Sequence, residues 1–300
     1  MLKRHGAELE DGFPLPVFSM TGLQTLRERC AITYSLLSVS SPQPYFDDTQ
    51  ESQEICRSLN EDMAALQKSN PAGIGFMAVL PLPDVAAALT ETRYALDTLK
   101  ARGVKLASNS RGLYLGDPRL DPLMEELNAR QSLVCVHPHR PAALTEGLFP
   151  SGPVPLYEFL ADTTRALLNL IGHYVILRYP RIRWIVPHCG SFLPNILDRV
   201  TALAPVLQNR GLMGKVAVQE SVSRLCFDLS GTPAPHLLKW LLTITTPENL
   251  IYGSDFPFTP LSTIESNLKG LEKLLESPEL QEHAEKICSG NAGKLLRPAP

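Results

Sequence analysis

The sequence predicts an α/β fold, a (β/α)8 TIM barrel that lacks its first strand. Short β-branched runs alternate with helical patterns along the 300 residues, and they recur roughly every 25 to 50 residues, as parallel βα units do. Three of the runs end in His137, His188 and Asp255, each followed within two residues by glycine or proline. Because the strands of such a barrel end at one rim, we expect these three side chains to meet there.

Seven strands and the intervening helices can be placed along the chain. The strands are expected at 32–39, 75–80, 104–107, 132–137, 183–188, 224–229 and 250–255. The helices are expected at 21–29, 49–68, 84–101, 122–130, 156–179, 193–207 and 234–243, with a helical tail at 262–275 and 279–296. Thr21 is the candidate cap of the first helix. Residues 11–16 and 108–118 are expected to be loops, and no strand opens the chain, so the missing strand is the first one.

Length and composition fit one large α/β domain as well as two small ones, and the lack of a linker or break in the sequence favours a single domain over residues 1–300. Hydrophobic residues make up 44% of the chain and charged residues 20%, enough for a substantial core. The formal net charge of -3 provides neither a basic face for nucleic acid nor a polybasic anchor for a membrane. The expected partners are therefore a small molecule and further copies of the same chain.

The cysteine pattern is that of a reduced, cytoplasmic protein. The six cysteines form no C-x-x-C pair, and two of them, Cys135 and Cys226, lie inside apolar runs. The first residues are charged and unlike a signal peptide, and no apolar run reaches the roughly 18 residues that a membrane span needs. We therefore expect core thiols and no membrane segment.

Asp255 lies in the motif Gly253-Ser254-Asp255-Phe256-Pro257, where glycine and serine are expected to let the backbone turn sharply toward the barrel mouth. The structural alternative is an aspartate that only caps the following turn. Histidines at equivalent strand ends favour an active-site role, because such barrels collect functional groups from several strands.

His137 can bind zinc or a similar ion as a neutral imidazole, although a lone histidine is more often structural. His139 is a weaker candidate, since Pro138 ends the strand.

His188 is the candidate acid/base group. The helix expected after Phe192 begins close to it, so its imidazole is expected to resist protonation and to act as a general base. A satisfied buried histidine is the alternative. A Cys189–His188 nucleophile pair is not expected, because neighbours in a strand point to opposite faces.

Substrate contacts can be suggested at three further positions. Arg111 in the long loop and Arg199 in the helix after His188 can clamp a carboxylate, because a guanidinium fork matches that anion. Phe256 can wall an aromatic substrate. The alternatives are solvated arginines and a packed aromatic ring. No role is assigned to the other histidines, His5, His173, His236 and His283.

Taken together, these motifs resemble the decarboxylase branch of the amidohydrolase superfamily, the family of aminocarboxymuconate-semialdehyde and resorcylate decarboxylases, and most of all its 6-methylsalicylate type. The resemblance runs from Gly12 to Leu296. It is carried by Val136-His137-Pro138, Pro187-His188-Cys189-Gly190 and Gly253-Ser254-Asp255-Phe256-Pro257, with support from Gly12-Phe13-Pro14-Leu15-Pro16, Leu80-Pro81-Leu82-Pro83-Asp84 and Tyr114-Leu115-Gly116-Asp117-Pro118. It implies that His137 and Asp255 are metal ligands, that His188 is the acid/base group beside the metal, and that the protein is a homodimer.

One feature of the family is missing. Its members begin with a strand that carries His-x-His, which supplies two further ligands, and this chain has no such motif near its start. Either the true start lies upstream, or half of the metal site has been lost. With His137 and Asp255 alone, metal affinity is expected to fall well below that of a site with three or four ligands.

The function expected from the resemblance is metal-dependent, non-oxidative decarboxylation of an ortho-hydroxylated aromatic acid such as 6-methylsalicylate or orsellinate. Zinc is the expected ion and manganese the second choice. A metal-dependent hydrolase of lactones or amides is the first alternative, because the fold alone does not decide the reaction. A non-catalytic relative or scaffolding partner is the second, motivated by the missing strand.

Overall fold

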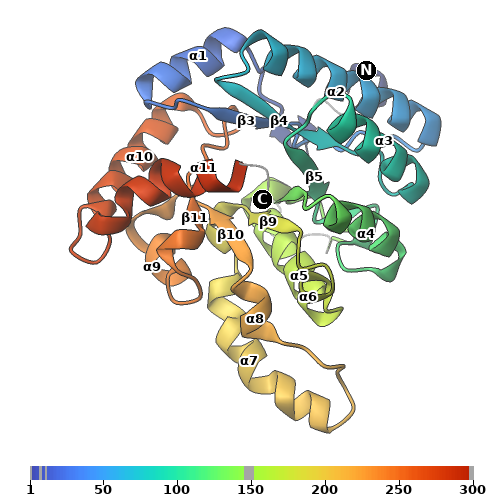
Figure 1. Cartoon of the computed structure of the whole chain (residues 1–300), viewed down its shortest axis with the longest axis vertical. Helices are drawn as coiled ribbons and strands as arrows, with labels where there is room; N and C mark the ends of the chain where they lie inside the picture. The colour runs from blue at the N-terminus through green and yellow to red at the C-terminus, as the bar shows by residue number, and fades with distance from the viewer. Residues whose placement is uncertain (1, 7–8, 11, 145–151, 297–300) are drawn as a thin grey trace. The chain divides into compact units, whose positions relative to one another are not determined.

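The computed structural model describes residues 2–6, 9–10, 12–144 and 152–296, and Figure 1 shows the whole chain. The chain divides into two compact units. The first comprises Met1–Leu15 and Tyr34–Ile182, and the second Pro16–Thr33 and Arg183–Pro300. The expectation of a single domain stays a prediction.

Four parallel strands form the centre of the first unit. In their order across the sheet they are β3 (Ser35–Ser38), β4 (Ile74–Val79), β5 (Gly103–Ala107) and β8 (Leu133–His137). All residues of β4 and β5 are buried, as expected for parallel strands that are covered on both faces. The register pairs Ala107 with His137, so β8 ends level with β5 and its histidine lies at the carboxyl end of the sheet.

Helices follow these strands at the expected places. They are α2 (Thr49–Ser69), α3 (Val85–Asp97), α4 (Asp121–Ala129), α5 (Glu158–Gly172) and α6 (Val175–Arg178). Helix α2 packs against β4 and α3 (Figure 1). The prediction of one continuous helix at 156–179 is wrong. Tyr174 has a φ of 62° and separates α5 from α6. A left-handed residue ends an α-helix, and sequence periodicity does not reveal it.

Two short antiparallel pairs were not expected from the sequence. One joins β1 (Leu9–Glu10) to β2 (Phe13–Pro14), and only β2 lies in the expected loop 11–16. The other joins β6 (Asn109–Ser110) to β7 (Leu113–Tyr114) inside the long loop after β5. Its two turn residues, Arg111 and Gly112, both have positive φ, of 55° and 82°, as the central residues of a type I′ hairpin require. The long loop therefore begins as a defined hairpin.

The second unit holds three parallel strands, in the order β9 (Arg183–Val186), β10 (Leu225–Asp228) and β11 (Leu250–Ile251). Its helices are α1 (Met20–Arg29), α7 (Leu193–Asn209), α8 (Val218–Val222), α9 (Leu238–Leu241), α10 (Leu261–Leu275) and α11 (Asn291–Leu296). Trp184 of β9 and Phe227 of β10 are fully buried in its core. None of the described helices combines the length and the apolar character needed to cross a membrane.

The predicted cap of the first helix is wrong, and a local hydrogen bond explains why. Ser19, not Thr21, caps α1, since the Ser19 hydroxyl accepts a hydrogen bond from the backbone N–H of Gly22 at 3.0 Å. The strands β9 and β11 also end before His188 and Asp255. Both functional candidates of this unit therefore lie in the turns that follow the strands, where backbone geometry can aim a side chain.

Candidate active site

His188 lies in a short turn directly after β9. Its backbone N–H points at β10, where it meets Oδ1 of Asp228 at 3.1 Å and Oγ of Ser230 at 3.2 Å. The turn is thus tied to the end of the neighbouring strand by backbone-to-side-chain hydrogen bonds. This arrangement sets the position of the His188 Cα, from which the imidazole projects.

The backbone from His188 to Ser191 is left-handed. The φ angles of His188, Cys189, Gly190 and Ser191 are 56°, 53°, 77° and 57°. Only glycine enters this region without cost, and residues held there concentrate at functional sites. Helix α7 begins at Leu193, so this left-handed run leads from His188 to the helix, and the expected effect of the helix N-terminus on the imidazole stays a prediction.

Asp228 is a functional candidate that the sequence reading missed. Its Oδ1 accepts hydrogen bonds from the backbone N–H of Ser230 at 3.0 Å and from the Ser230 hydroxyl, besides that of His188. A Cβ added to Gly253 would lie 3.0 Å from Asp228 Cγ, so the carboxylate also touches the segment after β11. The signal was available: the apolar run of β10 ends in a carboxylate, as the run before Asp255 does.

Asp255 completes this group. Its φ is 57°, so the sharp turn falls on the aspartate itself and not on Gly253, as the motif had suggested; Gly253 is required by the closeness of Asp228. Thr259 donates its backbone N–H to the carbonyl of Asp255 at 2.9 Å and its hydroxyl to Oδ2 at 3.1 Å. Burial raises the pKa of the Asp255 carboxyl, a nearby His188 opposes that rise, and the negative charge of Asp228 adds to it.

Cys189 does not form a nucleophilic pair with His188. Its side chain is 2% exposed, and burial raises the pKa of its thiol to about 12. A thiol with that pKa is protonated at neutral pH and is a poor nucleophile. The imidazole and the carboxylates therefore remain the candidate reactive groups of this unit.

In the first unit, His137 ends β8, and a hydrogen bond defines which ring nitrogen carries the proton. Its Nδ1 lies 2.8 Å from the carbonyl oxygen of Pro138, and because a carbonyl can only accept, Nδ1 carries the proton. The lone pair is then on Nε2, the arrangement common in metal-binding histidines. The strand does end at His137, as expected, and the backbone N–H of His139 donates to the Ser108 hydroxyl at 2.9 Å.

The three suggested substrate contacts lie in different surroundings. Arg111 forms an ion pair with Asp47 and lies over the ring of Tyr45, 5.3 Å from its centroid. Arg199 is exposed on α7. Phe256 lies against α1, since a Cβ on Gly22 would meet its ring at 3.2 Å. Their role toward a substrate stays a prediction.

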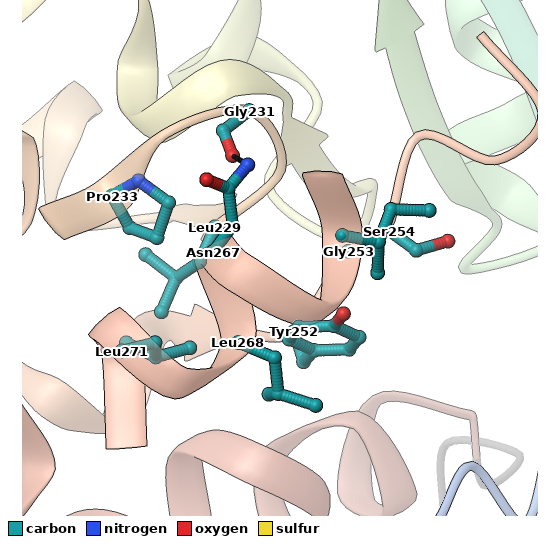
Figure 2. A pocket seen from close by; sticks show the side chains of 10 residues that line it. Leu229, Gly231, Pro233, Tyr252, Gly253, Ser254, Asn267, Leu268 and Leu271 are labelled. Carbon is teal, nitrogen blue, oxygen red and sulfur yellow. Dashed lines mark hydrogen bonds between the residues drawn. The ribbon is translucent and has the colours of Figure 1, made fainter. Parts of the chain in front are cut away.

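A small, partly open pocket lies next to Gly253 and Ser254 (Figure 2). Its walls include Leu229, Tyr252 and the α10 residue Leu271, and Asn267 closes one side by donating to the carbonyl of Gly231. The acidic and imidazole groups described above are not among its lining residues. This pocket therefore lies beside the turn before Asp255 and is lined by none of the candidate acid/base groups.

The donor chemistry of His137 and Asp255 suits a divalent cation such as zinc, which accepts imidazole nitrogen and carboxylate oxygen. Within the part of the chain that the structure describes, however, no three His, Cys, Asp or Glu side chains come together to hold a metal ion. The residue types are those of a metal site, but among the described residues fewer of them come together than a site with three ligands needs. The predicted meeting of His137 with His188 and Asp255 stays a prediction, because these residues belong to different units.

Parallel strands followed by imidazole and carboxylate side chains define the class of α/β barrel enzymes. The chain belongs to the amidohydrolase family, whose model matches residues 28–297. It is 29% identical over 301 residues to the 6-methylsalicylic acid decarboxylase of Penicillium expansum, with 99% of this chain and 91% of that protein covered. The resemblance inferred from the motifs is thereby confirmed.

Solved structures agree with this assignment. The crystal structure of an amidohydrolase II protein is 35% identical, has a TM-score of 0.90 and covers 98% of this chain and 94% of its own. This likeness confirms the expected α/β barrel class. A dihydroxybenzoic acid decarboxylase from Polaromonas, solved with bound manganese and an inhibitor, has a TM-score of 0.80 at 20% identity and covers 93% of this chain and 86% of its own. At that identity the likeness concerns the fold alone.

Proposed function

We propose that the protein is a non-oxidative decarboxylase, a carbon–carbon lyase, that acts on a small ortho-hydroxylated aromatic acid of the 6-methylsalicylate or orsellinate type. One observation carries the proposal: His188, Asp228 and Asp255 gather at the carboxyl ends of three neighbouring strands in a chain related along its whole length to a 6-methylsalicylic acid decarboxylase. Such a group of imidazole and carboxylates can hold and move a proton.

The reaction requires one proton transfer. The ring carbon that bears the carboxylate accepts a proton, the bond between that carbon and the carboxylate breaks, and its electron pair returns to the ring as carbon dioxide leaves. Asp255 or His188 delivers the proton. Asp228 holds His188 in place by accepting a hydrogen bond from the His188 backbone N–H. Protonation interrupts aromaticity, so positioning of the proton donor over the ring carbon is the main contribution expected from these residues.

A divalent cation belongs to this proposal, with His137 and Asp255 as its ligands among the residues of this chain. The manganese in the Polaromonas decarboxylase and the donor types support a cation, and zinc or manganese is the choice. When bound, such an ion supplies positive charge that orients the substrate carboxylate and phenolate. We further propose that Arg111, Arg199 and Phe256 contact the acid, and that the working form is a homodimer.

A cytoplasmic location is part of the proposal as well. All six cysteines are free, and free thiols are typical of reducing compartments. Cell fractionation with an antibody against the chain tests it, and recovery of the protein in the secreted fraction would contradict it.

Product analysis tests the proposed reaction. Purified protein is incubated separately with 6-methylsalicylate, orsellinate and an aromatic lactone, in the presence of zinc or manganese. Release of carbon dioxide with formation of the corresponding phenol is the expected result. A new carboxylate from the lactone would favour the hydrolase alternative, and no turnover with one ion bound per chain would support a non-catalytic relative.

A further inference from the structure

A buried carboxylate lies beneath the two loops that follow β5 and β8. Asp162 of α5 has no exposed surface, and it accepts hydrogen bonds from three side chains: the hydroxyl of Ser108, the amide of Asn109 at 2.8 Å and the phenol of Tyr114 at 2.5 Å. Nη1 of Arg165 lies 3.6 Å from its Oδ1. A buried charge is tolerated only when it is satisfied in this way, so the position is built for an anion.

Hydrogen bonds through Ser108 and Asn109 link the loop after β8 to Asp162. The backbone N–H of His139 donates to Ser108 Oγ at 2.9 Å, so the single proton of that hydroxyl is directed at Asp162. The backbone N–H of Ser108 donates to the carbonyl of His137 at 2.8 Å. Asn109 uses its side-chain amide for both Asp162 and the carbonyl of Arg140, at 2.8 and 2.9 Å.

We propose that Asp162 is a positioning residue for the segment His137–Arg140, acting through Ser108 and Asn109. The segment carries His137, whose role as a metal ligand rests on the proposed function. The geometry of the network itself does not depend on that role. Two backbone groups of the segment, the His139 N–H and the Arg140 carbonyl, are bonded to side chains that also donate to Asp162. Loss of Asp162 is therefore expected to loosen the segment at these two points.

The network requires a carboxylate, because all three side-chain partners donate. Burial and the hydrogen bond to Asp162 raise the pKa of Tyr114 to about 12, so the phenol keeps its proton and remains a donor. An asparagine at position 162 would turn an N–H₂ group toward at least one donor. Ser108 and Tyr114 thus both donate to the Asp162 carboxylate, but only Ser108 also accepts a hydrogen bond from His139.

This difference supplies a matched pair of variants. Ser108→Ala and Tyr114→Phe each delete one hydroxyl that donates to Asp162, and only the first removes the acceptor of the His139 amide. The whole protein is labelled with ¹⁵N-histidine, which gives seven backbone signals, and amide hydrogen exchange of His139 is followed by NMR. We expect exchange at His139 to accelerate at least tenfold in Ser108→Ala and in Asp162→Asn, and to change less than twofold in Tyr114→Phe.

Kinetics provide the second readout. With the best aromatic acid, kcat is expected to fall about 10- to 100-fold in Ser108→Ala and Asp162→Asn, the usual size of effects from groups that orient ligands, while Tyr114→Phe stays within about threefold. Equal exchange at His139 in Ser108→Ala and Tyr114→Phe would overturn the proposal, as would full turnover of Ser108→Ala. If Asp162→Asn does not fold, the other two variants still decide. If the wild type turns over no aromatic acid, the proposed function fails, and the exchange comparison still tests the positioning.

Discussion

Single residues at the strand ends determine what the proposed site can do. Asp228 joins the turns after β9 and β11 to the end of its own strand, and it does so because Gly253 leaves room for its carboxylate. Asp255 accepts a positive φ that costs an ordinary residue about 1 kcal/mol or more. The tight turn and the missing side chain at position 253 are therefore parts of one arrangement, in which Asp228 binds the His188 backbone and its charge acts on the nearby Asp255 carboxyl.

Replacing Asp255 with alanine is expected to abolish measurable turnover, with kcat falling by a factor of about 10² to 10⁴, because the variant loses a proton carrier and a predicted metal ligand. Thr259→Val, which removes only the hydroxyl that donates to Asp255 at 3.1 Å, is expected to lose less than about tenfold. Steady-state kinetics on both variants measure the difference. An active Asp255→Ala protein would contradict the assignment.

A methyl group at position 253 is expected to disturb Asp228 directly. The new Cβ would lie 3.0 Å from Asp228 Cγ, and crowding of this kind costs about 1–3 kcal/mol. Urea unfolding and turnover should both report the loss. Gly172→Ala is the control, since nothing lies within 4 Å of its added Cβ in helix α5, and it is expected to gain about 0.5–1 kcal/mol. Equal stability of the two variants would refute this account of Gly253.

At the scale of elements, short polar turns hold the loops from which functional residues project. The 3-10 turn η2 (Pro118–Leu120) follows the β6–β7 hairpin, and Asp117 caps it. Oδ1 of Asp117 accepts the backbone N–H of Arg119 at 2.9 Å, and the carboxylate also binds the guanidinium of Arg119 through two nitrogens, at 2.9 and 2.7 Å. The hydrogen bonds from Arg119 lower the pKa of the Asp117 carboxyl to about 2.

This shift predicts a pH-dependent contribution to stability. A carboxyl whose pKa is lower in the folded state stabilises the protein above its unfolded pKa of 3.8, and the contribution is lost as the pH falls toward about 2. Asp117→Asn is therefore expected to lower the free energy of unfolding at pH 7 by about 0.5–1 kcal/mol, typical of a partly exposed cap and ion pair. Urea unfolding at pH 7, 5 and 3 measures it, and a difference that stays constant across this range would argue against the cause.

At the scale of the whole molecule, the chain has the architecture of a family whose chemistry is done at strand ends. Each of its two units contributes such ends, His137 in the first and His188, Asp228 and Asp255 in the second. Burial of the strands holds these ends in place, because parallel strands covered on both faces have little freedom to shift.

Removal of metal is expected to abolish activity and to lower stability. After dialysis against a chelator, turnover should fall below about a tenth, and zinc or manganese should restore it. Ion at a hundred times its Kd should add about 2.7 kcal/mol to the free energy of unfolding, because binding to the folded state alone stabilises by mass action. Metal content and thermal unfolding are measured on the same samples. Full turnover of protein that holds less than a tenth of an ion per chain would exclude a metal requirement.

Much of the fold could be predicted from the sequence because its signals are local. The β-branched runs and amphipathic patterns located all seven parallel strands and most helices, and the expected helix at 49–68 agrees closely with α2 (Thr49–Ser69). The errors have backbone causes. Tyr174 breaks a helix through a positive φ, and Arg111 and Gly112 build a hairpin in an expected loop. Neither conformation leaves a periodic signal in the sequence.

The amino-acid sequence by itself determined the α/β class, the family, and the candidacy of His137, His188 and Asp255, because strand-forming runs and the residues that end them are adjacent in the chain. Only the tertiary structure decided that Asp228 holds the His188 turn and that Asp162 holds the loop after β8 through Ser108. The physical reason is that a hydrogen bond depends on distance in space. Asp228 and His188 are 40 residues apart in sequence and Asp162 and Ser108 are 54 apart, so folding alone brings them together.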